Sequence, residues 1–74
     1  MLKSAELTNP KSCLNRAKDN EIVFVLLARD VAAPEAIRAW IKERIWLGKN
    51  KPGDSQIVEA EKCAALMEVY CSSL

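Results

Sequence analysis

The sequence predicts an all-α domain, a small bundle of three to four short helices that is completed by association with further copies of the chain. The chain has 74 residues, a length at which one hydrophobic core is barely sufficient and association often supplies the missing stability. Apolar residues recur at helical spacing in its second half. Residues 22–28 form an unbroken apolar run without a solvent-facing side. We therefore expect one domain over residues 1–74, with residues 1–8 and 72–74 frayed, and a second copy as the cover of the run.

The first helix is predicted to begin after Thr8 and Asn9 and to end near Lys18. Either side chain can cap the free N–H groups of a first turn, and Pro10 is suited to the first helical position. Three residues would then share one face: Cys13, Leu14 and Ala17.

Residues 21–29 can be read as helix or as strand. Ile22, Val23 and Val25 are β-branched, which favours a strand, and periodicity cannot assign a short unbroken run. We favour a helix, because no second strand-like run is present to pair with a strand. In that interpretation Phe24, the largest side chain of the run, lies in an interface between protomers.

The next helix is predicted to begin at Pro34 and to end at Gly48. Proline fits a first helical turn, where Glu35 also meets the positive end of the helix dipole, and glycine is the usual left-handed terminator. Trp46 falls on the face opposite the apolar one. That apolar face is expected to contain Ile37, Trp40, Ile41, Ile45 and Leu47.

Residues 49–53 form the predicted loop before the last helix, which Asp54 or Ser55 would cap. The helix shows a second apolar stripe, Val58, Ala65 and Val69, well round from its main stripe, and we expect this second stripe to face a partner. The main stripe is Ile57, Ala60, Ala64, Met67 and Cys71.

Composition excludes several functional classes. Histidine is absent and the three cysteines are widely spaced, so we expect no metal and no cofactor. The apolar run is too short to span a bilayer, and the N-terminus lacks a signal-peptide core, so we expect no membrane partner and a cytoplasmic protein. A net charge of +1 makes nucleic-acid binding unlikely to be the main function. The basic residues 37–51 and the acidic residues 54–74 are expected to pair with each other, within one chain or between chains.

The sequence contains no catalytic constellation, and we expect no enzyme activity. Arginine is the most informative polar residue, because its planar fork binds phosphate or carboxylate. Arg44 falls within an apolar stripe and requires an anion, either a carboxylate of the acidic helix, which is the favoured partner, or a ligand phosphate. Arg29 and Arg38 form a second cluster, for which an internal salt bridge is the favoured explanation. The candidate ligand-binding residues, with two aromatic rings for stacking, are Arg29, Arg38, Arg44, Trp46 and Tyr70.

Residues 13–67 resemble short helical proteins encoded by tailed bacteriophages and prophages. The chain departs from that pattern at Ile22, where relatives often have proline, and at Leu27, where they have a basic residue. The matching residues are Val23-Phe24-Val25-Leu26, Ala28, Asp30, Ala33-Pro34-Glu35, Arg38-Ala39-Trp40, Glu59-Ala60 and Met67-Glu68. The resemblance implies a phage origin and an accessory role in the host bacterial cytoplasm. Such a role includes sequestering the nucleotide messengers of antiviral signalling.

We therefore expect a non-enzymatic homo-oligomer that binds a small anionic, nucleotide-type ligand or a host factor and antagonises host antiviral defence. One alternative is a direct protein inhibitor or scaffold without a small ligand, which would use Val58, Val69 and Trp46. A second alternative is a small DNA-binding regulator in which residues 38–51 form a recognition helix.

Overall fold

The computed structural model describes residues 2–72, and within this range it contains helices and no strand. The helices are α1 (Lys3–Thr8), α2 (Cys13–Arg16), α3 (Ala33–Trp46) and α4 (Ser55–Ser72). The all-α prediction is confirmed, whereas completion of the fold by further copies stays a prediction.

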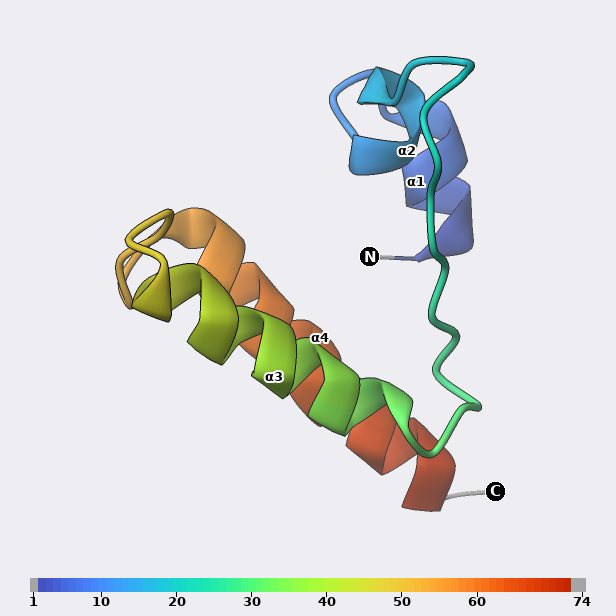
Figure 1. Cartoon of the computed structure of the whole chain (residues 1–74). Coiled ribbons are helices and arrows are strands. Elements are labelled where there is room, and N and C mark those ends of the chain that lie inside the picture. The colour runs from blue at the N-terminus through green and yellow to red at the C-terminus, as the bar shows by residue number, and fades with distance from the viewer. Residues whose placement is uncertain (1, 73–74) are drawn as a thin grey trace.

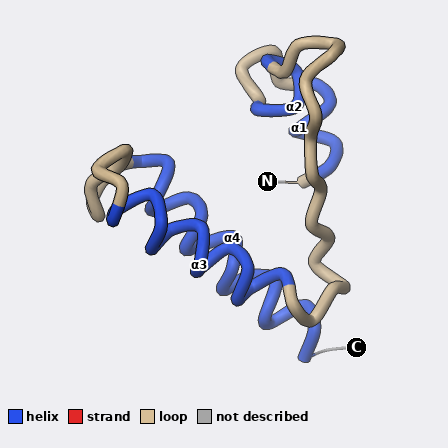
Figure 2. Tube along the Cα trace, in the orientation of Figure 1, coloured by secondary structure: helices blue, strands red, loops and turns tan. Residues whose placement is uncertain are grey.

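The four helices form two separate pairs (Figure 1). Helices α3 and α4 lie side by side as an antiparallel hairpin, while α1 and α2 contact each other and neither helix of the hairpin. A long segment without regular structure joins the pairs (Figure 2). The radius of gyration is 13.0 Å, compared with about 11 Å for a compact chain of this length. The chain is therefore more open than a single packed bundle.

The N-terminal pair differs from the predicted helix, which began after Asn9. Asn9 forms a turn in which its Oδ1 accepts the N–H of Lys11 at 2.9 Å, as asparagine often does in loops. Helix α2 begins only after Ser12, whose Oγ accepts the N–H of Asn15 at 3.2 Å. Helix α1 lies in the region expected to fray, residues 1–8. The predicted boundary was wrong because the Asn9 side chain forms this turn and does not cap a helix.

One side chain, Asn15, joins the two short helices. Its amide donates to the carbonyl oxygens of Glu6, Leu7 and Asn9 at 3.0, 3.0 and 2.9 Å. Ser12 Oγ also donates to the Glu6 carbonyl at 2.6 Å, and Ser12 is buried. These donors satisfy carbonyl groups that the end of a helix leaves without an intrahelical partner.

The helix favoured for residues 21–29 is absent, so that prediction is wrong. Residues 22–27 have no regular secondary structure and run as a drawn-out loop (Figure 2), and within the described chain no strand pairs with them. A short helix without tertiary packing is marginal in water, and β-branched residues are poor helix formers. Ile22 is 98% exposed and Phe24 is 87% exposed, so no packing surface within residues 2–72 stabilises a helix here.

Helix α3 has the predicted ends. Pro34 lies in its first turn with Glu35 beside it, and the helix ends at Trp46. Gly48 has a φ of 73°, the left-handed conformation expected of the terminator. Its N–H donates to the Ile45 carbonyl at 3.0 Å.

A small apolar core lies between α3 and α4. Ile57 and Ala64 of the main stripe are fully buried, and Ile41 of α3 is buried nearby in the hairpin. The rest of that stripe is partly exposed, as are Ile37 and Ile45 on the apolar face of α3. Trp40 and Leu47, expected on that same face, are exposed. Val58 and Val69 of the second stripe are exposed in the single chain, and the partner expected to cover this stripe stays a prediction. The core is thus confined to the hairpin and contains few large side chains.

The loop between α3 and α4 is organised by Asp54. Its Oδ2 accepts the backbone N–H of Lys51 at 2.9 Å and the side-chain amide of Asn50 at 3.1 Å. These two donors, the backbone N–H first, hold the pKa of the Asp54 carboxyl below its usual value of 3.8. The carboxylate closes the loop and does not cap the helix.

Replacing Asp54 with Asn should remove a pH-dependent contribution to stability. Because the folded-state pKa is depressed, the contribution is present above the unfolded pKa and is lost as pH falls through the lower folded pKa. We expect the wild-type advantage over Asp54→Asn to be constant from pH 7 to about pH 5 and to shrink below about pH 4. Urea unfolding of both proteins between pH 2 and pH 7 measures it. A difference that stays constant down to pH 2 would contradict this role.

Candidate binding surface around residues 22–28

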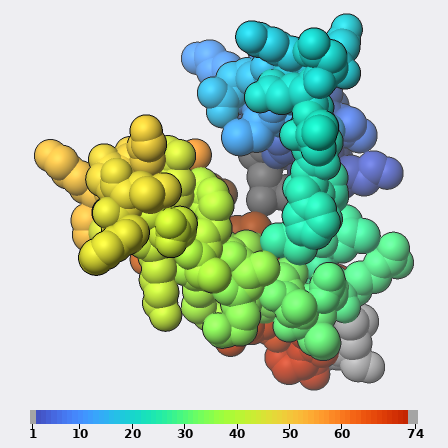
Figure 3. All heavy atoms as spheres, viewed as in Figure 1, coloured from blue at the N-terminus to red at the C-terminus, as the bar shows by residue number. Residues whose placement is uncertain are grey.

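The apolar run of residues 22–28 is the largest exposed apolar feature of the segment between the two helix pairs. Phe24 and Val25 are exposed, and only Leu26 and Ala28 are partly covered. In the space-filling view the segment forms a column at the molecular surface between the N-terminal pair and the hairpin (Figure 3). Continuous exposed apolar surface of this kind often marks an interaction site.

The backbone of the run is also unpaired. No N–H or C=O group of residues 22–26 takes part in a hydrogen bond with another described residue. The first bonds appear at the end of the run, where the Leu27 carbonyl accepts from Asp30 N–H at 3.0 Å and the Ala28 carbonyl accepts from Cys71 Sγ at 2.8 Å. The hydrogen bond from Cys71 attaches the end of the apolar run to α4. Residues 22–26 have no such attachment to the hairpin among the described residues.

Two open cavities adjoin the run. One, of about 490 Å³, lies against the hairpin and is lined by Phe24, Leu26, Ile37 and Trp40 among others. The larger, of about 960 Å³, extends from the run toward α1 and α2 and reaches Met67 of α4. Its charged lining residues are Lys3, Glu6 and Arg29. The run therefore contributes apolar walls to both cavities.

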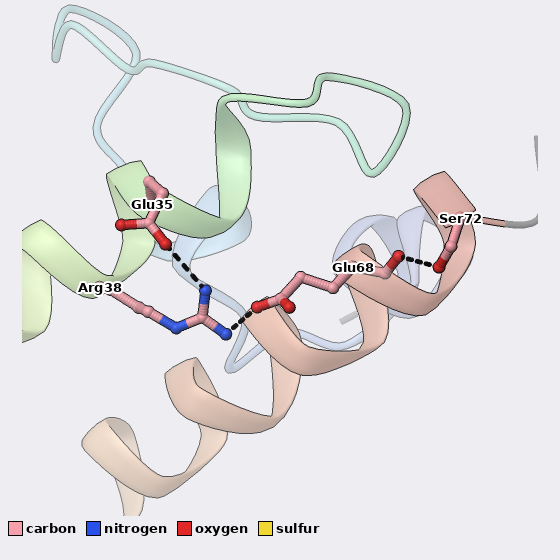
Figure 4. Close-up of polar contacts among 4 residues, drawn as sticks. All are labelled: Glu35, Arg38, Glu68 and Ser72. Atoms are coloured by element: carbon pink, nitrogen blue, oxygen red, sulfur yellow. Dashed lines mark hydrogen bonds and ion pairs between the residues drawn. The ribbon is translucent and has the colours of Figure 1, made fainter.

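The predicted ligand residue Arg38 is engaged by two carboxylates (Figure 4). Its Nη1 donates to Oε1 of Glu35 at 3.1 Å, and its Nη2 donates to Oε1 of Glu68 on α4. The Glu68 carbonyl in turn accepts from Ser72 Oγ at 2.7 Å. The expected internal salt bridge and the expected pairing of basic with acidic segment are both present at Arg38.

Arg44 has a partner that the sequence did not predict. Its Nε donates to Oδ1 of Asn50 at 2.6 Å, and its guanidinium lies 5.6 Å from the centre of the Trp40 ring. No carboxylate contacts it among the described residues, so the favoured carboxylate partner was wrong. The loop after α3 brings an amide oxygen to Arg44, and a half-exposed cation needs less compensation than a buried one.

The remaining predicted ligand residues lie at opposite ends of the hairpin, with Arg29 and Tyr70 at the end where Ala28 and Cys71 are hydrogen-bonded. Arg29 lies before the start of α3 and on the larger cavity, whereas Trp46 lies at the other end of α3 and is 84% exposed. Tyr70 is near the end of α4. One chain therefore does not bring the five predicted residues together.

Comparison with protein-family models, with curated proteins and with solved structures finds no match to the chain. Within the described range, no helix combines the length and the apolar character needed to cross a bilayer. The same residues contain no cluster of three or more side chains suited to hold a metal ion.

The apolar run was predicted from the sequence, but the cavity-lining residues of α1 beside it were not. Lys3 and Glu6, in a region expected to fray, line the larger cavity. Glu6 is held there because one of its carboxylate oxygens accepts the Leu14 N–H at 2.8 Å. The capping pattern of Ser12 and Asn15 could have indicated an ordered N-terminus, since both types satisfy free backbone groups.

Proposed function

We propose that this protein is a non-enzymatic homo-oligomeric binding protein that takes up a small anionic, nucleotide-type ligand. The observation that supports this proposal is the larger cavity, which combines apolar walls with Arg29 and Lys3. Ligand cavities are mostly apolar with a few polar groups that fix orientation, and they commonly measure about 300 to 1,000 Å³. A volume of about 960 Å³ accommodates a nucleotide.

Arg29 is the arginine best suited to the ligand's phosphate. Arg38 is paired with Glu35 and Glu68, and Arg44 is bonded to Asn50. Arg29 is exposed and forms no ion pair or hydrogen bond with another described residue. A guanidinium binds phosphate through two parallel N–H bonds, and Phe24 on the same cavity provides a ring on which a base can stack.

The biological role follows from the resemblance of residues 13–67 to small phage proteins. A phage protein that binds a nucleotide without chemistry removes that nucleotide from solution. We propose that it acts in the bacterial cytoplasm by sequestering a messenger of host antiviral signalling.

Arg29→Ala should weaken binding of a cyclic dinucleotide about 10-fold to 100-fold, since a hydrogen bond to a charged group contributes about 1.5 to 3 kcal/mol. Isothermal titration calorimetry of the full chain measures the dissociation constant. Lys49→Ala is the matched control, because it removes the same charge in the loop after α3, away from the cavity lining. Equal weakening by both variants, or no binding by the wild type, would argue against the site.

A protein inhibitor or scaffold is the second candidate function. It is favoured by the exposure of Trp46, Val58 and Val69, since aromatic and apolar side chains on a surface often anchor a partner. The DNA-binding alternative has less support, because Arg38 and Arg44 of its recognition helix are occupied by internal partners.

A further inference from the structure

Residues 22–27 have the properties of an unpaired β-strand. They are extended, they include three β-branched residues, and the backbone groups of residues 22–26 are unbonded within the described chain. An exposed apolar strand edge presents a row of donors and acceptors that pairs readily with another strand. Hydrogen bonding alone does not specify which strand that is.

The charges at the two ends of the run identify the partner. Glu21 precedes the run and Arg29 follows it, and both are exposed. In an antiparallel pair of two copies, Glu21 of each copy lies opposite Arg29 of the other. A parallel pair would instead place Glu21 opposite Glu21 and Arg29 opposite Arg29, and like charges directly opposite are destabilising. We propose that residues 23–27 of two copies pair as antiparallel β-strands about a two-fold axis through Val25, which places Arg29, in the turn after the run, beside Glu21 of the other copy.

The register follows from the pattern of the run. Opposite residues in an antiparallel pair point to the same face, so a two-fold axis perpendicular to the ribbon must pass between two copies of the same residue. With Val25 on the axis, Phe24 faces Leu26 of the second copy, and each apolar residue of the run faces another. A shift of the axis to Phe24 would place Glu21 opposite Leu27. Register is determined by such matching wherever a face is buried.

The apolar surface available to the two copies is of the size that a specific interface uses. A phenylalanine side chain buries about 150 to 250 Å², and Phe24 is 87% exposed in the single chain. The apolar side chains of residues 22–27 on two copies together provide on the order of 1,000 Å², the area that a specific interface needs. The ribbon would also cover the apolar walls of the cavity that Phe24 and Leu26 line.

This inference rests on the self-association in the proposed function. It adds which residues of the two copies pair and in which direction the two strands run. The guanidinium of Arg29 has five N–H donors. It can therefore contact Glu21 of the second copy and a ligand phosphate together. Ligand binding is measured by calorimetry and pairing by sedimentation, so the two ideas are tested separately.

Charge reversal tests the antiparallel pairing. We expect Glu21→Arg and Arg29→Glu each to weaken the dimer about 10-fold, because each replaces two attractive contacts with two repulsive ones. The double variant Glu21→Arg/Arg29→Glu should restore the dissociation constant to within about three-fold of the wild type. Sedimentation equilibrium of the full chain measures it. Glu43→Arg, an exposed reversal on α3, is the control and should have no effect.

Cysteine crosslinking tests the register. In a full-length background carrying Cys13→Ser, Cys63→Ala and Cys71→Ser, we expect Val25→Cys to form the disulfide-linked dimer fastest. A residue on the axis faces itself, whereas Phe24→Cys would lie diagonally, about 7 to 8 Å from its copy, too far for an unstrained disulfide. Circular dichroism confirms that each variant keeps its helices.

The outcomes are distinct. A monomer at all concentrations overturns both the pairing and the self-association. A dimer whose dissociation constant does not change on charge reversal, or that crosslinks fastest at Phe24→Cys, overturns the proposed pairing. Self-association would still stand in either case. The proposed pairing is supported if each single charge reversal weakens the dimer and the double variant restores its dissociation constant. Fastest crosslinking at Val25→Cys supports the proposed register.

Discussion

Ile57→Ala is expected to lower the free energy of unfolding by about 2 to 5 kcal/mol, the range for truncating a buried isoleucine. Ile57 has no exposed surface and is the largest fully buried side chain among the described residues. Domains are stable by only about 5 to 15 kcal/mol, and a chain of this size lies near the lower end. The substitution should therefore leave a substantial unfolded fraction at 37 °C, measured by urea unfolding followed by circular dichroism.

Val58→Ala is the matched control, because the neighbouring side chain lies on the exposed stripe of the same helix. Surface substitutions usually change stability by less than about 0.5 kcal/mol. Equal effects at Ile57 and Val58 would mean that α4 does not present the Ile57 face to α3 in solution.

Phe24→Ala is expected to destabilise the oligomer by about 3 to 5 kcal/mol, the range for truncating a buried aromatic. The single chain leaves Phe24 87% exposed, so this loss appears only when a second copy covers the ring. We expect a shift toward monomer and a melting temperature that depends more steeply on protein concentration. Sedimentation combined with thermal unfolding at several concentrations measures both.

The control for Phe24 is Leu66→Ala, since Leu66 is also an exposed apolar side chain, on α4 and outside the run. It should leave the oligomer unchanged. If Phe24→Ala remains an oligomer with unaltered thermal stability, the run is not the assembly surface.

The second half of the fold was predictable because its signals are local. Pro34 begins a helix and Gly48 ends one through their own backbone preferences, without help from distant residues. The buried positions Ile41, Ile57 and Ala64 also follow from helical spacing alone. The pairing of Arg38 with Glu68 was predictable in kind, because complementary charge on two adjacent helices leaves few other partners.

The first half of the fold was less predictable because several of its side chains can form more than one kind of hydrogen bond. Asn9 can cap a helix or form a turn, and the hydrogen bonds of Asn15 across α1 and α2 favour the turn. Arg44 needed a polar partner, and the loop supplied Asn50 where a carboxylate was expected. The dispersal of the candidate ligand residues likewise depends on how α3 separates Arg29 from Trp46.

By itself, the sequence determined the all-α class, the two helices α3 and α4 with the loop between them, and the presence of an apolar run that lacks a solvent-facing side. Only the tertiary structure decided that the run is extended, because helix or strand in a short apolar run depends on what packs against it. No helix covers Ile22 or Phe24 within the described chain, so nothing repays the loss of conformational freedom that helix formation would require. The backbone of the run therefore stays extended, with its hydrogen-bonding groups available to another strand.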